Sequence, residues 1–174
     1  KEQMERTGIG SVICLSGEES IDYALGEERS FFHEKIREAG HELCLETSYE
    51  AAYYKTGEPE FCRLIAEIVH FIVAHPAPFL VHCRLGSDRT GVVCAVLSAL
   101  CGASWPEIAR DYEMTSRVGL GEYRNARLLS HALSLIAGFP VSSETKLDQR
   151  IAEKLCSNGW ITYREVEQLS AALS

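Results

Sequence analysis

Residues that can attack or bind an anion are concentrated in the segment "HCRLGSDRTG" (residues 82–91). It holds a cysteine and an arginine separated by five residues, Cys83 and Arg89, with Thr90 directly after the arginine. A cysteine thiolate is a nucleophile, and an arginine can bind two oxygens of a tetrahedral oxyanion at once. The spacing therefore predicts a turn that holds an anion against the nucleophile. The alternative is that Cys83 is an inert buried thiol beside a solvated loop.

The elements on either side of this segment favour the anion site. The apolar run Phe79–His82 predicts a strand, and a helix is expected from about Arg89 to Leu100. The first N–H groups of a helix have no intrahelical partner, and the helix dipole adds positive charge at that end. Gly86 permits the backbone conformation that turns successive amides toward one centre. The residues expected to bind phosphate are Arg84, Leu85, Gly86, Ser87, Asp88 and Arg89.

A free thiol has a pKa near 8.5 and is only about 3% thiolate at pH 7. Lowering the pKa of Cys83 by about three units requires about 4 kcal/mol, which the loop amides, the helix terminus and Arg89 can supply together. We expect His82 to fix the backbone beneath the loop rather than to act as a base. Thr90 is expected to donate to the sulfur when the thiolate leaves.

The string "HCRLGSDRTG" resembles the phosphate loop of the cysteine-dependent protein tyrosine phosphatase superfamily. Its "DRTG" ending and the later "IARDYEMTS" (Ile108–Ser116) resemble bacterial tyrosine phosphatase-like proteins related to the dual-specificity group. The resemblance extends over roughly residues 9–116. It implies that Cys83 attacks phosphorus to form a cysteinyl-phosphate that water hydrolyses, and that Arg89 binds the phosphoryl oxygens. It implies neither a metal ion nor another cofactor.

The acid that protonates the leaving group is less clearly marked. Many members of the superfamily use an aspartate upstream of the cysteine, but this chain has no aspartate between Asp22 and Asp88. Asp88 is the first candidate, because some superfamily members with a "DR" loop are thought to use that position. A purely structural role, in which Asp88 braces the loop, is the alternative. Upstream glutamates are the remaining candidates: Glu46, Glu50, Glu58 and Glu60.

Related loops often carry a lysine where this chain has Ser87, and that second cation favours polyphosphorylated inositol headgroups. The sequence therefore predicts phosphotyrosine or mixed phosphoprotein substrates first, and phosphoinositides or inositol phosphates second, with Arg84 supporting the second. A phosphate-binding module without turnover, a pseudophosphatase, is the alternative of another class. A redox role for the thiol would need a resolving cysteine near Cys83, and the candidates are Cys14, Cys44 and Cys62.

The overall composition excludes several other classes of function. The 174-residue chain has a formal net charge of −8, which disfavours a general nucleic-acid surface. No apolar run approaches the roughly 20 residues that span a bilayer. Seven cysteines without close pairs predict reduced thiols, a cytoplasmic protein and no zinc site. The sequence leaves the oligomeric state open.

The pattern along the chain predicts an α/β fold, with a central, mostly parallel sheet flanked by helices and a helical C-terminal half. Further strands are expected at residues 9–16 and 41–46, and helices at 27–40, from Pro59 to about 74, at 105–115 and at 121–137. Residues 1–138 are expected to form the α/β domain. Residues 139–174 are expected to form a helical pair packed on it, with Ser142 or Ser143 capping the first helix and Thr162 the second.

Overall fold

Three parallel strands form the sheet at the centre of the computed structural model, which describes residues 6–17, 31–117 and 125–174. The strands are β1 (Ser11–Cys14), β2 (Glu42–Cys44) and β3 (Phe79–His82), in the order β2-β1-β3. The register pairs Cys14 with Cys44 on one side and with His82 on the other. The carboxyl ends of all three strands therefore lie at one edge of the sheet, which is the edge from which the 83–87 loop departs.

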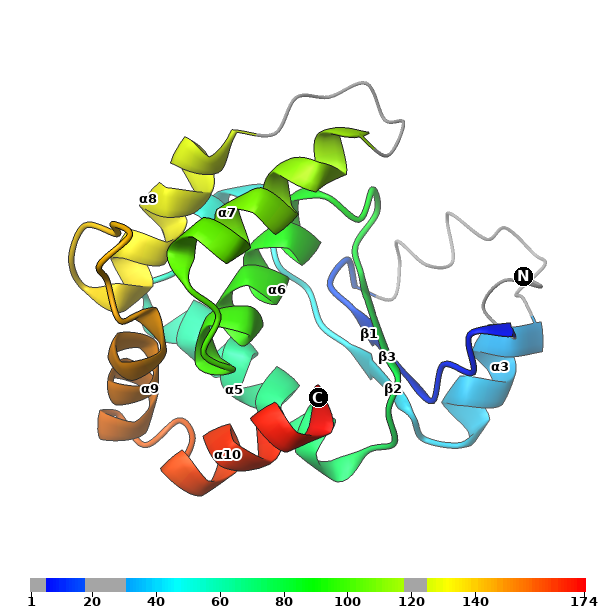
Figure 1. Cartoon of the computed structure of the whole chain (residues 1–174). Coiled ribbons are helices and arrows are strands. Elements are labelled where there is room, and N and C mark those ends of the chain that lie inside the picture. The colour runs from blue at the N-terminus through cyan, green and yellow to red at the C-terminus, as the bar shows by residue number, and fades with distance from the viewer. Residues whose placement is uncertain (1–5, 18–30, 118–124) are drawn as a thin grey trace.

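Helices cover both faces of the sheet (Figure 1). Helix α3 (Phe31–Glu38) packs on one face, where Ile36 meets Val12 of β1. Ile13, the next residue of β1, points to the opposite face and belongs to the main core. That core includes α5 (Pro59–Ala74) and α6 (Asp88–Leu100). The α/β class with a parallel sheet flanked by helices is confirmed.

The remaining helices surround α5 and α6. They are α4 (Tyr49–Tyr54), α7 (Trp105–Met114), a 3-10 turn η1 (Thr115–Arg117), α8 (Ala126–Ala137), α9 (Leu147–Ser157) and α10 (Tyr163–Ala172). Local signals fix most of their ends. Ser104 and Glu107 form a capping box that opens α7, and Gly138, with φ of 81°, ends α8. None of the helices within the described ranges is long and apolar enough to cross a membrane.

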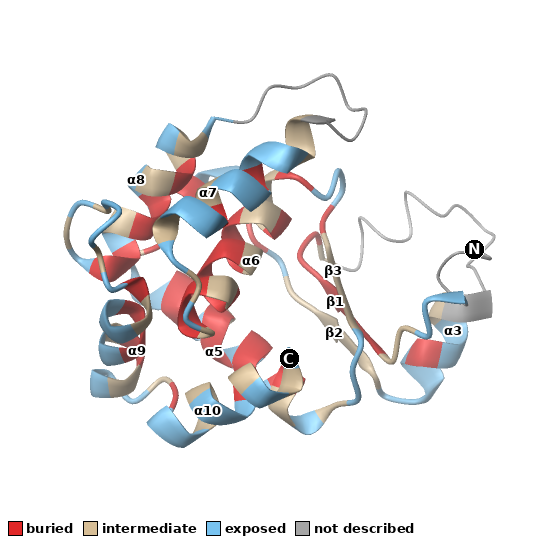
Figure 2. Ribbon diagram, in the orientation of Figure 1, coloured by how far each residue is buried: buried red, intermediate tan, exposed pale blue. Residues whose placement is uncertain are grey.

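The two C-terminal helices share the main core. Helix α9 packs on α6 and α8, and α10 packs on α5 and α9. The inward faces of these helices are buried and their outer faces exposed (Figure 2). At the turn between them, the guanidinium of Arg63 lies 5.3 Å from the centre of the Trp160 ring. The apolar residues that join the pair to the core are Leu147, Ile151, Leu155 and Leu169.

Several helix boundaries differ from the sequence expectation. Helix α9 begins at Leu147, and neither Ser142 nor Ser143 caps it. The reason is local, because the Thr145 hydroxyl accepts a hydrogen bond from the Ser142 N–H at 2.9 Å and closes a separate turn before the helix. Thr162 caps α10 as predicted. Helix α6 begins one residue early, at Asp88. Residues 27–30 and 121–124, where two helices were expected to begin, lie outside the described residues.

Candidate active site

The loop of residues 83–87 connects the end of β3 to the first residue of α6. Cys83, the first loop residue, is only 8% exposed. Gly86 has a φ of 73°, the left-handed conformation that a loop needs in order to turn its amides inward. No side-chain contact explains this glycine, since a Cβ there would meet no atom within 4 Å. Its role is therefore conformational.

The surroundings of the Cys83 sulfur favour the thiolate. Burial raises the pKa of this thiol, but hydrogen bonds from the Thr90 hydroxyl and from the backbone N–H groups of Thr90, Gly86 and Leu85 outweigh it. The net effect is a pKa below the ordinary value for cysteine. Among the described residues, the buried Thr90 hydroxyl bonds no other protein oxygen or nitrogen. The sulfur is thus the acceptor open to it.

Arg89 connects α6 to the carboxyl edge of the sheet. Its Nη1 donates to the carbonyl of Leu15 at 3.3 Å and to that of Thr47 at 3.2 Å. Leu15 directly follows β1, and Thr47 lies in the segment between β2 and α4. Within the described part of the chain, Nε and Nη2 make no hydrogen bond. One side of the guanidinium is fixed by backbone carbonyls, which leaves the other two nitrogens available to an oxyanion.

His82 lies beneath the loop as the last residue of β3. Its Nδ1 is 3.3 Å from the carbonyl oxygen of Cys83. Burial lowers the pKa of His82, so the imidazole is neutral near pH 7, and Nδ1–H can donate to that carbonyl. The ring also meets the ring of His33 edge-on, with centroids 6.2 Å apart. His82 therefore contacts the backbone of the nucleophile.

Asp88 is held by a tyrosine of α4. The Tyr53 hydroxyl donates to Oδ1 of Asp88 at 3.0 Å, and the Ser87 hydroxyl donates to Oδ2 at 3.4 Å. Tyr53 is fully buried, and its hydroxyl also bonds the hydroxyl of Tyr112. Burial and the bond with Tyr112 raise the pKa of Tyr53, so it remains protonated. The one sequence signal for the position of the Tyr112 ring is Gly91, a glycine inside a helix. A Cβ at Gly91 would lie 2.7 Å from Cε2 of Tyr112.

Comparison with known proteins shows the family of this chain. The sequence model of the tyrosine phosphatase family matches residues 12–146, from β1 to the residue before α9. The chain belongs to the tyrosine phosphatase family. No curated protein and no solved structure is significantly similar to it. The matched residues include β3, the 83–87 loop and α6, so the geometry described above belongs to a phosphatase.

The upstream glutamates of this phosphatase differ in their surroundings. Glu46 is exposed and lies beside Thr47, the residue whose carbonyl binds Arg89. Glu50 pairs with Lys55 at 3.0 Å on the exposed side of α4. Glu58 is the N-cap residue of α5, without a side-chain cap bond, and Glu60 lies in the first turn of that helix. Asp88 follows the loop directly and begins α6, so it is the carboxyl group nearest to Cys83 along the chain. Glu46 precedes Thr47, whose carbonyl accepts a hydrogen bond from Arg89.

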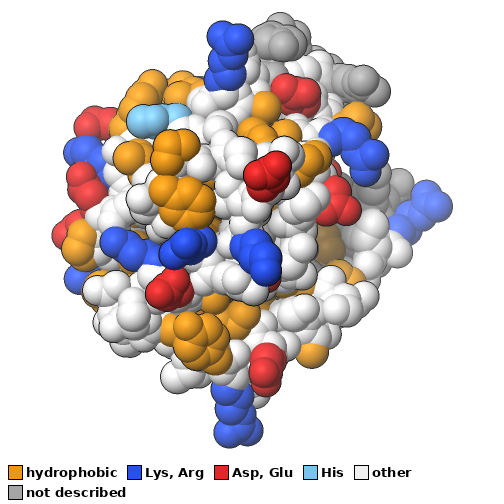
Figure 3. Space-filling model, turned by 60° about the vertical axis from the view of Figure 1, so that its left-hand side comes forward, with side chains coloured by type: hydrophobic (Ala, Val, Ile, Leu, Met, Phe, Trp, Pro, Cys, Tyr) orange, Lys and Arg blue, Asp and Glu red, His pale blue; other side chains and the backbone are white. Residues whose placement is uncertain are grey.

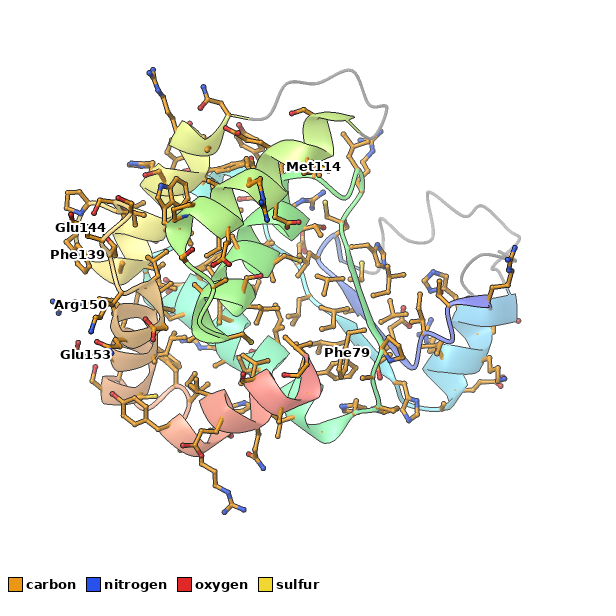
Figure 4. The ribbon with its side chains drawn as sticks, in the orientation of Figure 1. Phe79, Met114, Phe139, Glu144, Arg150 and Glu153 are labelled. Atoms are coloured by element: carbon orange, nitrogen blue, oxygen red, sulfur yellow. The ribbon has the colours of Figure 1, made fainter. Side chains whose placement is uncertain are left out.

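Exposed apolar side chains lie in the phosphatase loop and on helices α4 and α7. Leu85 is 52% exposed, and Tyr49 is half exposed with its ring 4.8 Å from the ring of Tyr53. Met114 ends α7 with an exposed side chain and projects from that end of the helix (Figure 4). Arg84 is the exposed cation of the loop. On the helical side of the molecule, basic, acidic and apolar side chains are interspersed (Figure 3). Within the described residues, no group of three or more His, Cys, Asp or Glu residues could hold a metal ion.

Proposed function

We propose that this phosphatase hydrolyses phosphomonoesters through a cysteinyl-phosphate formed on Cys83. The observation that carries the proposal is the set of donors around the sulfur, which lowers the pKa of Cys83 in spite of its burial. The thiolate attacks phosphorus while Nε and Nη2 of Arg89 bind the phosphoryl oxygens. Water then hydrolyses the S–P bond, and the Thr90 hydroxyl donates to the departing sulfur. The phosphate-binding residues are Arg84 to Arg89.

We assign the general acid to Asp88. It is the first residue of α6, so it adjoins both the loop amides and Arg89. In its protonated form it gives the proton to the leaving-group oxygen as the P–O bond breaks, a contribution of about 10²–10⁴ in rate. Glu46 is the second candidate, whereas Glu50 is occupied by Lys55. His82 supports the loop backbone and takes no part in proton transfer.

Phosphotyrosine, alone or together with other phosphorylated side chains of proteins, is the substrate that this site suits best. Exposed Leu85 and Tyr49 offer apolar surface for an aromatic ring. Ser87 is buried and directed at Asp88, so no second cation stands at that position of the loop. A polyphosphorylated inositol would have only Arg84 as an additional cationic partner in the loop. We therefore rank it second as a substrate.

The first test is phosphate release from p-nitrophenyl phosphate between pH 5 and 8, with Cys83→Ser as the control. Turnover that disappears in Cys83→Ser, together with an acid-trapped phosphoprotein detected by mass spectrometry, is the expected result. A wild-type chain that binds vanadate but releases no phosphate would instead make it a phosphate-binding module. A phosphotyrosine peptide and an inositol phosphate, compared at equal concentration, then decide the substrate class.

We also propose that residues 139–174 are an appendage of the domain formed by residues 1–138 and not a separate unit. The support is that Leu147, Ile151, Leu155 and Leu169 belong to the same apolar core as α5 and α6. All seven cysteines are free thiols, which suits a reducing compartment, and we place the protein in the cytoplasm on that ground. Limited proteolysis that releases a stable 1–138 fragment would contradict the first of these two proposals.

A further inference from the structure

Three helices meet at the carboxyl group of Asp88. Tyr53 comes from α4, Tyr112 from α7, and Asp88 itself begins α6. Both tyrosines are buried, with exposures of 0% and 5%. Their hydroxyl groups bond one another, and that of Tyr53 also bonds Oδ1 of Asp88. Two buried phenols at one carboxyl group are a costly arrangement unless every proton has an acceptor.

The direction of these hydrogen bonds follows from the number of protons. A phenol has one proton to donate, and an ionised carboxylate only accepts. Tyr53 therefore uses its proton on Oδ1 of Asp88, and the proton between the two phenols comes from Tyr112. The chain runs from Tyr112 to Tyr53 to Asp88. The raised pKa of Tyr53 agrees with a phenol that stays protonated throughout the working pH range.

We propose that Tyr53 and Tyr112 are positioning residues for the proton transfer, because they hold Oδ1 of Asp88 and thereby orient the carboxyl group that gives the proton. The inference rests on the proposed function, in which Asp88 is the acid. As the P–O bond breaks, its electron pair goes to the leaving oxygen, which takes the proton from the carboxyl group of Asp88. The negative charge that remains on Asp88 is then stabilised by the Tyr53 hydroxyl, and the Ser87 hydroxyl faces Oδ2 at 3.4 Å.

The surrounding packing is arranged to keep the two phenols in place. Gly91 sits one turn after Asp88 on α6, and only the absence of a Cβ allows the Tyr112 ring to lie against that helix. On the other side, the Tyr49 ring packs on the Tyr53 ring. Ser48 caps α4 by accepting from the Ala51 N–H at 3.0 Å, which fixes the start of the helix that carries Tyr53. The tyrosine hydroxyls are thus placed by rigid elements and not by a free loop.

The test compares two substrates that differ in their need for an acid. Phenyl phosphate has a poor leaving group and depends on protonation, whereas 2,4-dinitrophenyl phosphate has a good leaving group and does not. In Tyr53→Phe, we expect kcat/KM for phenyl phosphate to fall about 10- to 100-fold, the equivalent of one hydrogen bond to a charged group. For 2,4-dinitrophenyl phosphate we expect less than about a 3-fold change. Asp88→Asn should show the same selectivity with a larger loss.

Tyr54→Phe is the matched control, because Tyr54 is the next residue of α4 and is half exposed. Tyr54→Phe should leave the turnover of both substrates unchanged. Tyr112→Phe removes only the second phenol and should give the same selectivity with a smaller loss. Tyr112→Phe also keeps the test valid if Tyr53→Phe fails to fold correctly. The vanadate affinity and the urea midpoint of each variant will reveal such a defect.

The possible outcomes separate the inference from the function on which it rests. Equal losses on both substrates in Tyr53→Phe and Tyr112→Phe, or no loss on either, would overturn the positioning role. An Asp88→Asn variant without leaving-group selectivity would overturn it as well, while an inactive Cys83→Ser leaves the cysteine mechanism intact. Turnover that persists in Cys83→Ser would instead contradict the proposed function itself.

Discussion

Gly91→Ala sets two known effects against each other behind the active-site loop. In the interior of a helix, alanine is more favourable than glycine by about 1 kcal/mol, so the substitution would ordinarily stabilise α6. Here the new Cβ would lie 2.7 Å from Cε2 and 2.9 Å from Cδ2 of Tyr112. Carbon atoms in contact are normally about 3.5–4.0 Å apart, so the ring must move by roughly 1 Å. Overpacking of this kind costs about 1–3 kcal/mol, and the net result is a loss of about 0–2 kcal/mol.

The measurement is urea unfolding of the wild type and of Gly91→Ala, repeated in a Tyr112→Leu background. With the ring removed, Gly91→Ala should stabilise the protein by about 1 kcal/mol, because only the helix preference remains. In the wild-type background, displacement of Tyr112 should also reduce turnover of phenyl phosphate more than that of 2,4-dinitrophenyl phosphate. If Gly91→Ala stabilised both backgrounds equally and left turnover unchanged, the close packing between α6 and α7 would play no part in the site.

Further predictions concern the nucleophile, the anion clamp and the C-terminal helix. Thr90→Ala should raise the pKa of Cys83, because it removes the hydroxyl that donates to the sulfur, whereas Thr90→Ser should not; the pH dependence of iodoacetamide alkylation measures it. Because the pKa of Cys83 is lowered on folding, its thiolate stabilises the fold fully above the unfolded value near 8.5, and this is lost as pH falls through the folded pKa. The unfolding free energy of the wild type should therefore rise relative to Cys83→Ser between pH 5 and 9, and a constant difference would contradict the lowered pKa. Arg89→Lys loses the planar fork that binds two carbonyls and, in the proposed mechanism, the anion as well, so kcat/KM should fall by at least about 100-fold. Thr162→Ala removes the capping box with Glu165 and should cost about 1 kcal/mol in urea unfolding without a change in kcat.

Alkylation can distinguish Cys83 from four other thiols, whose pKa values are raised because no comparable set of hydrogen bonds outweighs their burial. The pKa of Cys94 is raised to about 11. Burial also raises the pKa values of three further thiols, those of Cys62, Cys101 and Cys156. At pH 6–8, mass spectrometry of the labelled peptides should therefore find Cys83 modified before these four.

The features that the sequence predicted are those that depend on neighbours along the chain. The strand at Phe79–His82, the proline start of α5 and the capping boxes of α7 and α10 are set by residues within one turn of each other. The Cys83–Arg89 spacing belongs to the same group. The cap of α9 was predicted wrongly for a comparable reason, because Thr145 competes for Ser142 and a serine alone does not show which of its neighbours it will bond.

The contacts that the sequence did not predict join residues that are far apart in the chain. Tyr53 and Asp88 are separated by 35 positions, and Arg89 and the carbonyl of Leu15 by 74. A carbonyl ligand carries no side-chain signal at all, since every residue has one. Tyr53 and Tyr54 are adjacent, and the sequence does not show which of the two is buried and which is exposed. That is decided only when α4 packs against α6.

The two chemical groups at the end of the loop are held by different parts of the fold. Arg89 is fixed to the sheet, through carbonyls that follow β1 and precede α4, whereas Asp88 is fixed to helices, through phenols from α4 and α7. Binding of the phosphoryl group and protonation of the leaving group should therefore respond to different substitutions. Changes at Tyr53, Tyr112 or Gly91 should alter the dependence on the leaving group at nearly constant vanadate affinity. Arg89→Lys should weaken vanadate binding and lower the turnover of every substrate alike. If a substitution at Arg89, or one at Tyr53, Tyr112 or Gly91, changed both the vanadate affinity and the dependence on the leaving group, the two supports would be coupled.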